Sequence, residues 1–270
     1  MSKKVKVIVL RTAGTNCDEE TAFAFKNFKA QADLVHINKL FKWQVRLKDY
    51  HILAIPGGFT YGDDIESGRI LANELCIHLG ADLCEFIDQR KLIIGICNGF
   101  QVLVKSGILP GPLNEIEKLK KDFSQKATLT TNNSGKFEDR WTYLKVNGKS
   151  VWTKGLRDLV YFPVAHAEGK FVAQDDAVLN RLNNNGQVVF RYCSRVGSQP
   201  KYPENPNGSV DNIAGITDAT GRILGLMPHP ERHFLFRHHP RWTRLKDRGP
   251  WGDGAKIFEN GVQYVKKNLL

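Results

Sequence analysis

The chain has 270 residues, of which 41% are hydrophobic and 25% are charged, an ordinary composition for a globular protein. It contains no apolar run long enough to span a bilayer, and its basic first residues lead into a short strand-like run, which excludes a signal peptide. Its five cysteines are irregularly spaced and include no Cys-x-x-Cys pair, so the sequence predicts no metal site and no disulfide framework. We therefore expect a reduced, cytoplasmic setting without membrane association.

The formal net charge of +11 is the unusual feature of the composition. Basic residues concentrate at 118–121 and at 237–248. A solvated basic face explains the first cluster, whereas the second could face an anionic partner. Because the sequence has no zinc finger, no basic-region heptads and no aromatic RNA-binding signature, nucleic-acid binding is not expected.

Strand-like and helix-like segments alternate through the first hundred residues. The apolar runs that predict strands are 5–10, 32–36, 51–55 and 92–94. Helices are expected from Asp18, which could cap the first one, at 70–79, near 83–87, and from Cys97 to about Gly107. This alternation is typical of a parallel sheet with helices on both faces, in which functional sites lie at the carboxyl ends of the strands.

The second half is richer in polar β-type residues. The segments 127–132, 141–146, 170–173 and 187–192 predict antiparallel strands at the edge of the sheet. A turn is expected at 183–186 and a closing amphipathic helix from residue 256 onward. Because no linker interrupts the chain, we predict one domain over 1–270, with a basic insertion at about 234–254 that is either ordered or a mobile arm. The predicted fold class is α/β, with a mostly parallel central sheet flanked by helices and an antiparallel edge.

The first motif that indicates catalytic chemistry is a predicted strand followed by a glycine-flanked cysteine. The motif is Gly95-Ile96-Cys97-Asn98-Gly99, directly after the apolar run 92–94. It has the layout of a nucleophile elbow, in which a strained turn lifts the nucleophile out of the sheet and a helix N-terminus favours a thiolate. A buried core thiol is the alternative interpretation of Cys97 taken alone.

A general base is available far downstream, in Pro228-His229-Pro230-Glu231. The two prolines restrain the backbone at His229, and on an extended segment Glu231 would point to the same side and reach the imidazole. The order Cys97, His229, Glu231 therefore predicts a catalytic triad.

These two motifs resemble the signatures of the class I (triad) glutamine amidotransferases, and residues 55–59 resemble the oxyanion loop of that family. Four further segments, 14–18, 57–63, 163–169 and 205–216, are similar to the glutaminase subunits of phosphoribosylformylglycinamidine synthases. The resemblance extends over about residues 5–233 and implies a flavodoxin-like α/β fold.

The resemblance also implies a function and its partners. The chain would hydrolyse glutamine to glutamate and ammonia, and the ammonia would pass to a synthetase subunit that uses ATP and Mg²⁺ to form formylglycinamidine ribonucleotide in purine biosynthesis. A small accessory subunit would complete the complex. Since the sequence has no phosphate-binding loop of the Gly-x-x-x-x-Gly-Lys type, no cofactor is expected on this chain.

Specific roles follow for the residues around the triad. The oxyanion of the reaction would be bound by the backbone N–H groups of Gly58 and Asn98, and the resemblance implies that Gln101 contacts the bound glutamine. The resemblance places Cys17 near an interdomain surface, while His166 and Glu168 belong either to the glutamine site or to the partner interface. Two rival classes remain. One is a different class I amidotransferase or an unrelated cysteine hydrolase with the same elbow, and the other is a non-catalytic interaction protein that retains the fold.

Overall fold

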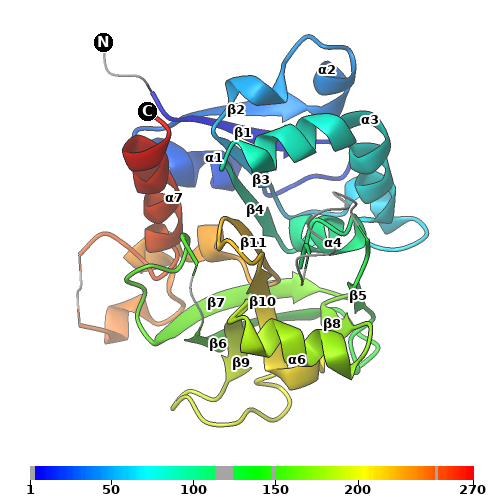
Figure 1. Ribbon diagram of the computed structural model, residues 1–270. Coiled ribbons are helices and arrows are strands. Elements are labelled where there is room, and N and C mark those ends of the chain that lie inside the picture. The colour runs from blue at the N-terminus through cyan, green and yellow to red at the C-terminus, as the bar shows by residue number, and fades with distance from the viewer. Residues whose placement is uncertain (1–3, 113–123, 148–149, 247–248) are drawn as a thin grey trace.

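Nine strands join in one sheet at the centre of the computed structural model, which describes residues 4–112, 124–147, 150–246 and 249–270 (Figure 1). In sheet order these strands are β2 (Gln31–His36), β1 (Lys6–Arg11), β3 (Ile52–Ile55), β4 (Leu92–Ile96), β11 (Ile223–Leu226), β10 (Ile213–Thr217), β9 (Val188–Cys193), β6 (Glu138–Val146) and β7 (Leu159–His166). The pairs from β2 to β11 are parallel and those from β11 to β7 are antiparallel. The predicted α/β fold with a parallel sheet and an antiparallel part is therefore confirmed.

The helices are α1 (Asp18–Asn27), α2 (Ile37–Phe41), α3 (Arg69–Asp88), α4 (Asn98–Lys105), α6 (Asp176–Asn184) and α7 (Ala255–Asn268). Helices cover both faces of the parallel strands, whereas α6 packs against the short strand β8 (Lys170–Ala173). The first helix packs against the last, α1 on α7, while α3 packs on α4. These two pairs lie on opposite sides of the sheet (Figure 1), because right-handed crossovers toward opposite edges place their helices on opposite faces.

The parallel strands at the centre of the sheet are buried along their whole length because both of their faces are covered. Every residue of β3, β4 and β11 is buried, as are the four inner residues of β1.

Within the described residues, no helix combines the length and apolarity that crossing a membrane requires. The basic cluster at 118–121 lies outside the described residues.

Two expectations for the β-rich half were wrong in detail. The predicted strands at 127–132 and 170–173 do not extend the main sheet but form a separate antiparallel pair, β5 (Ala127–Thr130) with β8 (Lys170–Ala173). Their buried residues Leu129 and Phe171 face each other in register, and Phe171 stacks on Phe100 of α4 at 6.3 Å between ring centroids. The small sheet therefore covers the outer side of α4.

The helical prediction also needs two corrections. The two helices expected at 70–79 and 83–87 are one continuous helix, α3, since Leu79 and Leu83 bury the same face across Gly80. Asp18 does not cap α1: Cys17 occupies the N-cap position and Asp18 lies in the first turn.

The closing helix is confirmed as α7. The basic insertion contains two short 3₁₀ turns, Phe236–His238 and Trp242–Arg244.

Gly99 fixes how closely α4 approaches β3. A methyl group at this position would lie 1.9 Å from the Ile55 carbonyl oxygen, which is backbone and cannot rotate away. We expect Gly99→Ala to lower the free energy of unfolding by about 1–3 kcal/mol, the usual cost of overpacking a core. Urea unfolding followed by circular dichroism measures this change.

Gly80→Ala is the matched control. A methyl group at Gly80 meets no atom within 4 Å and lies in the interior of α3, so this variant should gain about 0.5–1 kcal/mol from helix propensity. Equal stability of the two variants would contradict the close packing of α4 on β3.

Candidate active site

Cys97 occupies a strained turn between β4 and α4. Its backbone has φ +53° and ψ −107°, a conformation that costs a residue with a side chain about 1–3 kcal/mol. Its N–H donates to the Leu226 carbonyl at 2.8 Å, which anchors the turn to β11. A methyl group on Gly95 would lie 2.5 Å from the Gly99 carbonyl oxygen, so the flanking glycines are a steric requirement of the turn. The backbone is that of a nucleophile elbow.

His229 and Glu231 follow β11, the parallel neighbour of β4. The segment after His229 is a 3₁₀ turn, Pro230–His233, and not the extended strand that we expected. The turn still brings the two side chains together, with Glu231 Oε1 2.6 Å from His229 Nδ1 and both side chains buried. The backbone N–H of His229 donates to the Pro163 carbonyl at 2.8 Å, so β7 also holds the segment that carries the base.

The electrostatics of His229 favour its charged form. Burial opposes the imidazolium, but the nearby Glu231 and Cys97 raise the pKa of His229 well above the ordinary value of 6.5. Within the described part of the chain, the buried Nε2 atom of His229 has no hydrogen-bond partner, which leaves it available for chemistry. A protonated imidazole beside a cysteine sulfur is the arrangement that activates thiol nucleophiles.

The loop after β3 closes the site on its other side. At Gly57, a methyl group would lie 2.8 Å from His229 Cε1 and 3.4 Å from Cys97 Cβ, so this residue sits between nucleophile and base. Gly58 has φ +149°, and a methyl group there would lie 2.6 Å from the Gly14 carbonyl oxygen. Hydrogen bonds from Cys17 N to Gly57 O (3.2 Å) and from Phe59 N to Gly14 O (2.9 Å) hold the backbone on either side of Gly58.

Asn98 begins α4, so its backbone N–H is among those that a helix N-terminus leaves without an intrahelical partner. The Asn98 side chain has a further role that the sequence did not reveal. Its Oδ1 accepts from Thr60 Oγ1 at 2.8 Å, and its Nδ2 donates to Asp63 Oδ1 at 3.2 Å and to Gln101 Oε1 at 3.0 Å. It therefore ties the loop after β3 to the nucleophile helix.

Gln101 is buried and not on the helix surface. Its Nε2 donates to the Glu168 carbonyl at 2.6 Å, which fixes the loop that follows β7. The carboxylate of Glu168 accepts from Ser67 N at 3.2 Å and lies 3.7 Å from Lys105 Nζ. Gln101 thus positions the wall of the site, and its predicted contact with glutamine stays a prediction.

His166 ends β7 beside the nucleophile, since the neighbouring Ala165 carbonyl lies 3.7 Å from Cys97 Sγ. Burial, followed by the nearby His229, lowers the pKa of His166 to about 4, so this side chain is neutral. The His166 and Glu168 side chains turn to different neighbours, because the Glu168 carboxylate accepts from Ser67 N whereas the His166 ring lies against Gly169.

Cys17 and Arg232 are the site residues that sequence reasoning missed. The Cys17 side chain is buried, with Sγ 3.9 Å from His229 Nδ1, and does not lie at a surface of this chain. Arg232 Nη2 donates to Cys17 Sγ at 3.2 Å, and Arg232 Nε is 3.0 Å from Glu20 Oε1 of α1. The only sequence signal was position: Cys17 follows β1, and Arg232 follows the triad acid.

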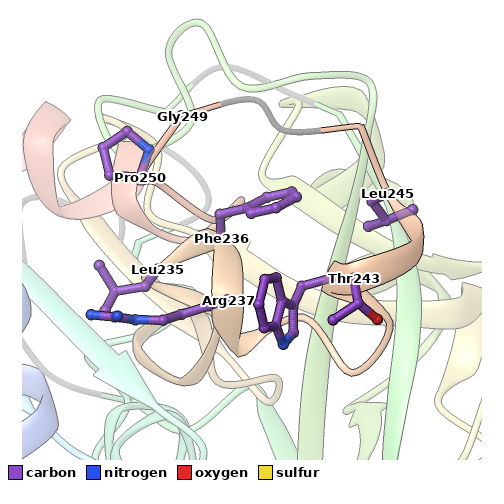
Figure 2. Close-up of a pocket in the computed structure, with 8 residues that line it drawn as sticks. Leu235, Phe236, Arg237, Thr243, Leu245, Gly249 and Pro250 are labelled. Atoms are coloured by element: carbon purple, nitrogen blue, oxygen red, sulfur yellow. The ribbon is translucent and has the colours of Figure 1, made fainter.

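The basic insertion forms an open cavity of about 600 Å³. It is lined by Leu235, Phe236, Arg237, Trp242, Thr243, Leu245, Gly249 and Pro250 (Figure 2). None of these residues belongs to the predicted triad or to the predicted oxyanion loop, so this cavity is separate from the candidate active site.

The geometry provides a strained cysteine nucleophile, a buried His–Glu pair and a glycine loop at the carboxyl ends of adjacent strands. This combination suits attack on an amide or ester carbonyl. Residues 4–265 match the family model of the CobB/CobQ-like glutamine amidotransferase domain. The class of protein is therefore a glutamine amidotransferase.

Similar proteins narrow the class further. The chain is 49% identical over 269 residues to the phosphoribosylformylglycinamidine synthase subunit PurQ of Dehalococcoides mccartyi, covering 98% of this chain and 99% of that protein. It is 44% identical to PurQ of Archaeoglobus fulgidus, covering 98% of each. A chain in the structure of PurLQS from Thermotoga maritima superimposes with a TM-score of 0.72 at 28% identity, covering 97% of this chain and 100% of that chain. The chain belongs to the family of phosphoribosylformylglycinamidine synthase subunit PurQ.

The raised pKa of His229 gives a direct test of the site's electrostatics. Replacing Glu231 with Gln removes a negative charge that favours the imidazolium, so the pKa of His229 should fall toward or below 6.5 as burial gains the larger influence. A histidine Cε1 proton NMR titration measures it.

Glu20→Gln serves as the control, because Glu20 pairs with Arg232 and not with the imidazole. It should leave the His229 titration close to that of the unmodified chain. If Glu231→Gln titrated like the unmodified chain, Glu231 would not be the group that holds the proton on His229.

Proposed function

We propose that this chain is the glutaminase subunit of a phosphoribosylformylglycinamidine synthase. It hydrolyses glutamine to glutamate and ammonia, and the ammonia passes to an ATP-dependent synthetase that converts formylglycinamide ribonucleotide to formylglycinamidine ribonucleotide in purine biosynthesis. The observation that carries the proposal is the 2.6 Å contact between His229 and Glu231, both buried, beside a strained Cys97. Similarity to PurQ proteins over nearly the whole chain supports the same function.

The reaction begins with attack of the Cys97 sulfur on the carboxamide carbon of glutamine. The negative charge that develops on the carbonyl oxygen is stabilised by the backbone N–H groups of Gly58 and Asn98. His229 gives its proton to the departing nitrogen, which leaves as ammonia, and a thioester remains on Cys97.

Hydrolysis of the thioester completes the cycle. His229, now neutral, takes a proton from water, and the resulting hydroxide attacks the thioester carbon to release glutamate and the Cys97 sulfur. Glu231 stabilises the imidazolium and holds the tautomer that leaves Nε2 facing the substrate. Gln101 and the loop that it fixes, which includes Glu168, shape the wall that receives the glutamine.

The partners follow from the same family membership. The synthetase subunit corresponds to PurL and the small accessory subunit to PurS of the Thermotoga maritima assembly. ATP and Mg²⁺ act on the synthetase, since the steps assigned to this chain need only cysteine, imidazole and water. The complex works in the cytoplasm, where a reduced thiol nucleophile persists.

The test is glutamate release from glutamine by the purified chain, with and without the synthetase and accessory subunits. Cys97→Ala removes the nucleophile and should lower glutamine-dependent activity by at least about 10³-fold, as loss of a nucleophile does in other triads. The complex that contains this variant should still form product when ammonia is supplied, because the synthetase step does not use Cys97.

Cys76→Ser is the matched control, since Cys76 is half-buried on α3 and its thiol donates to the Ser106 carbonyl at 3.6 Å, away from the candidate active site. It should retain full activity. Glutamine-dependent activity that survived in Cys97→Ala would rule out the triad mechanism and favour a non-catalytic role for this fold.

A further inference from the structure

Three potential metal ligands converge on one side of the catalytic imidazole. Among the described residues, one group of at least three His, Cys, Asp or Glu side chains has its ligand atoms within 4.8 Å of one another: Cys17, His229 and Glu231. All three are buried. The glutaminase reaction uses His229 and Glu231 but assigns no step to Cys17.

The donor set is that of a zinc site. Sulfur, imidazole nitrogen and carboxylate oxygen are the three ligand types that Zn²⁺ takes, at about 2.3, 2.0 and 2.1 Å. In a tetrahedral site these bond lengths separate sulfur from nitrogen by about 3.5 Å and nitrogen from oxygen by about 3.4 Å. Cys17 Sγ is already 3.9 Å from His229 Nδ1, and Glu231 Oε1, now at 2.6 Å, would withdraw as the ion replaces the shared proton.

Unsatisfied polar atoms provide a second, independent observation. Among the residues that the structure describes, none donates a hydrogen bond to Glu231 Oε2, and the Glu231 side chain is fully buried. A buried carboxylate oxygen without a donor is costly unless a ligand or cation completes its environment. With three protein ligands, the fourth position of a tetrahedral ion remains for water.

The surroundings set the cost of occupying this site. Burial raises the pKa of the Cys17 thiol, so the ion must displace its proton, while Arg232 Nη2 at 3.2 Å from Sγ favours the thiolate. The guanidinium also repels a cation, but its charge is shared with Glu20. Binding therefore releases one proton from the thiol and one from the imidazole, and it should strengthen as the pH rises.

We propose that Cys17, His229 and Glu231 form an inhibitory binding site for a thiophilic divalent cation of the Zn²⁺ type. The ion bonds to the nitrogen that Glu231 otherwise holds, so it separates the triad acid from the base and stops glutamine hydrolysis. The inhibitory effect rests on the proposed glutaminase function, whereas the binding site itself does not.

The binding test uses Cd²⁺, whose bond to a thiolate gives an ultraviolet charge-transfer absorbance. It is done on Cys97→Ala, so that the nucleophile cannot supply the sulfur. We expect one saturating Cd²⁺ per chain with this absorbance, its loss when Cys17→Ser is added, and its persistence when Cys76→Ser is added instead. No absorbance in Cys97→Ala, or an absorbance that survives Cys17→Ser, would overturn the site.

The activity test uses Zn²⁺ and glutamate release by the otherwise unmodified chain. Cys17→Ser should raise the Zn²⁺ concentration for half-inhibition by at least about tenfold, the scale of affinity lost when a metal site loses a supporting group. Cys76→Ser should be inhibited like the unmodified chain, and equal inhibition of all three would overturn the proposal. Cd²⁺ binding through Cys17 in a chain without glutaminase activity would keep the site and reject the proposed function.

Discussion

The parallel pairing of β4 with β11 is the contact on which the rest of the site depends. These strands are separated by well over a hundred residues in the chain, yet Ile96 lies opposite Leu226 in the sheet. The Cys97 N–H extends this pairing by donating to the Leu226 carbonyl. Because both strands end at the same edge, the elbow cysteine and the segment with His229 emerge side by side. On the other side of β4, β3 delivers Gly57 to the same place.

Close packing of backbone then shapes the site. The positions at Gly57, Gly95 and Gly99 lie so near neighbouring atoms that a side chain would need those atoms to move. The strained backbone of Cys97 costs about 1–3 kcal/mol. Burial of a single aliphatic side chain in the flanking strands contributes about as much. A core built from fully buried β3, β4 and β11 can therefore hold one strained residue, and the strain presents its sulfur to a substrate.

The electrostatic layer behind the imidazole has more members than a triad requires. Glu231 holds His229, and Arg232, one residue further, reaches back to Cys17 and to Glu20 of α1. The base is thus connected to the loop after β1 and to the first helix. Within this layer, Glu231 favours the protonated form of the buried imidazole, and Cys17, His229 and Glu231 are the three donors from which we infer a cation site. Catalysis and inhibition would therefore compete for the same nitrogen.

The sequence by itself predicted most of the parallel strands, because strands buried on both faces are apolar runs. It also predicted the elbow and pointed to Cys97, His229 and Glu231 as candidate catalytic residues, through motifs with glycine and proline at fixed spacings. Only the tertiary structure decided what surrounds them. Cys17 approaches His229, and the Asn98 side chain joins Thr60 to Gln101, through strand order and loop paths that no local pattern encodes. The pairing of β5 with β8 depended on the apolar surface of α4, and the 3₁₀ turn after His229 on the packing of β7. A local pattern reports whether a residue is buried, but which partner it meets depends on segments distant in the chain, and that choice is made by the fold as a whole.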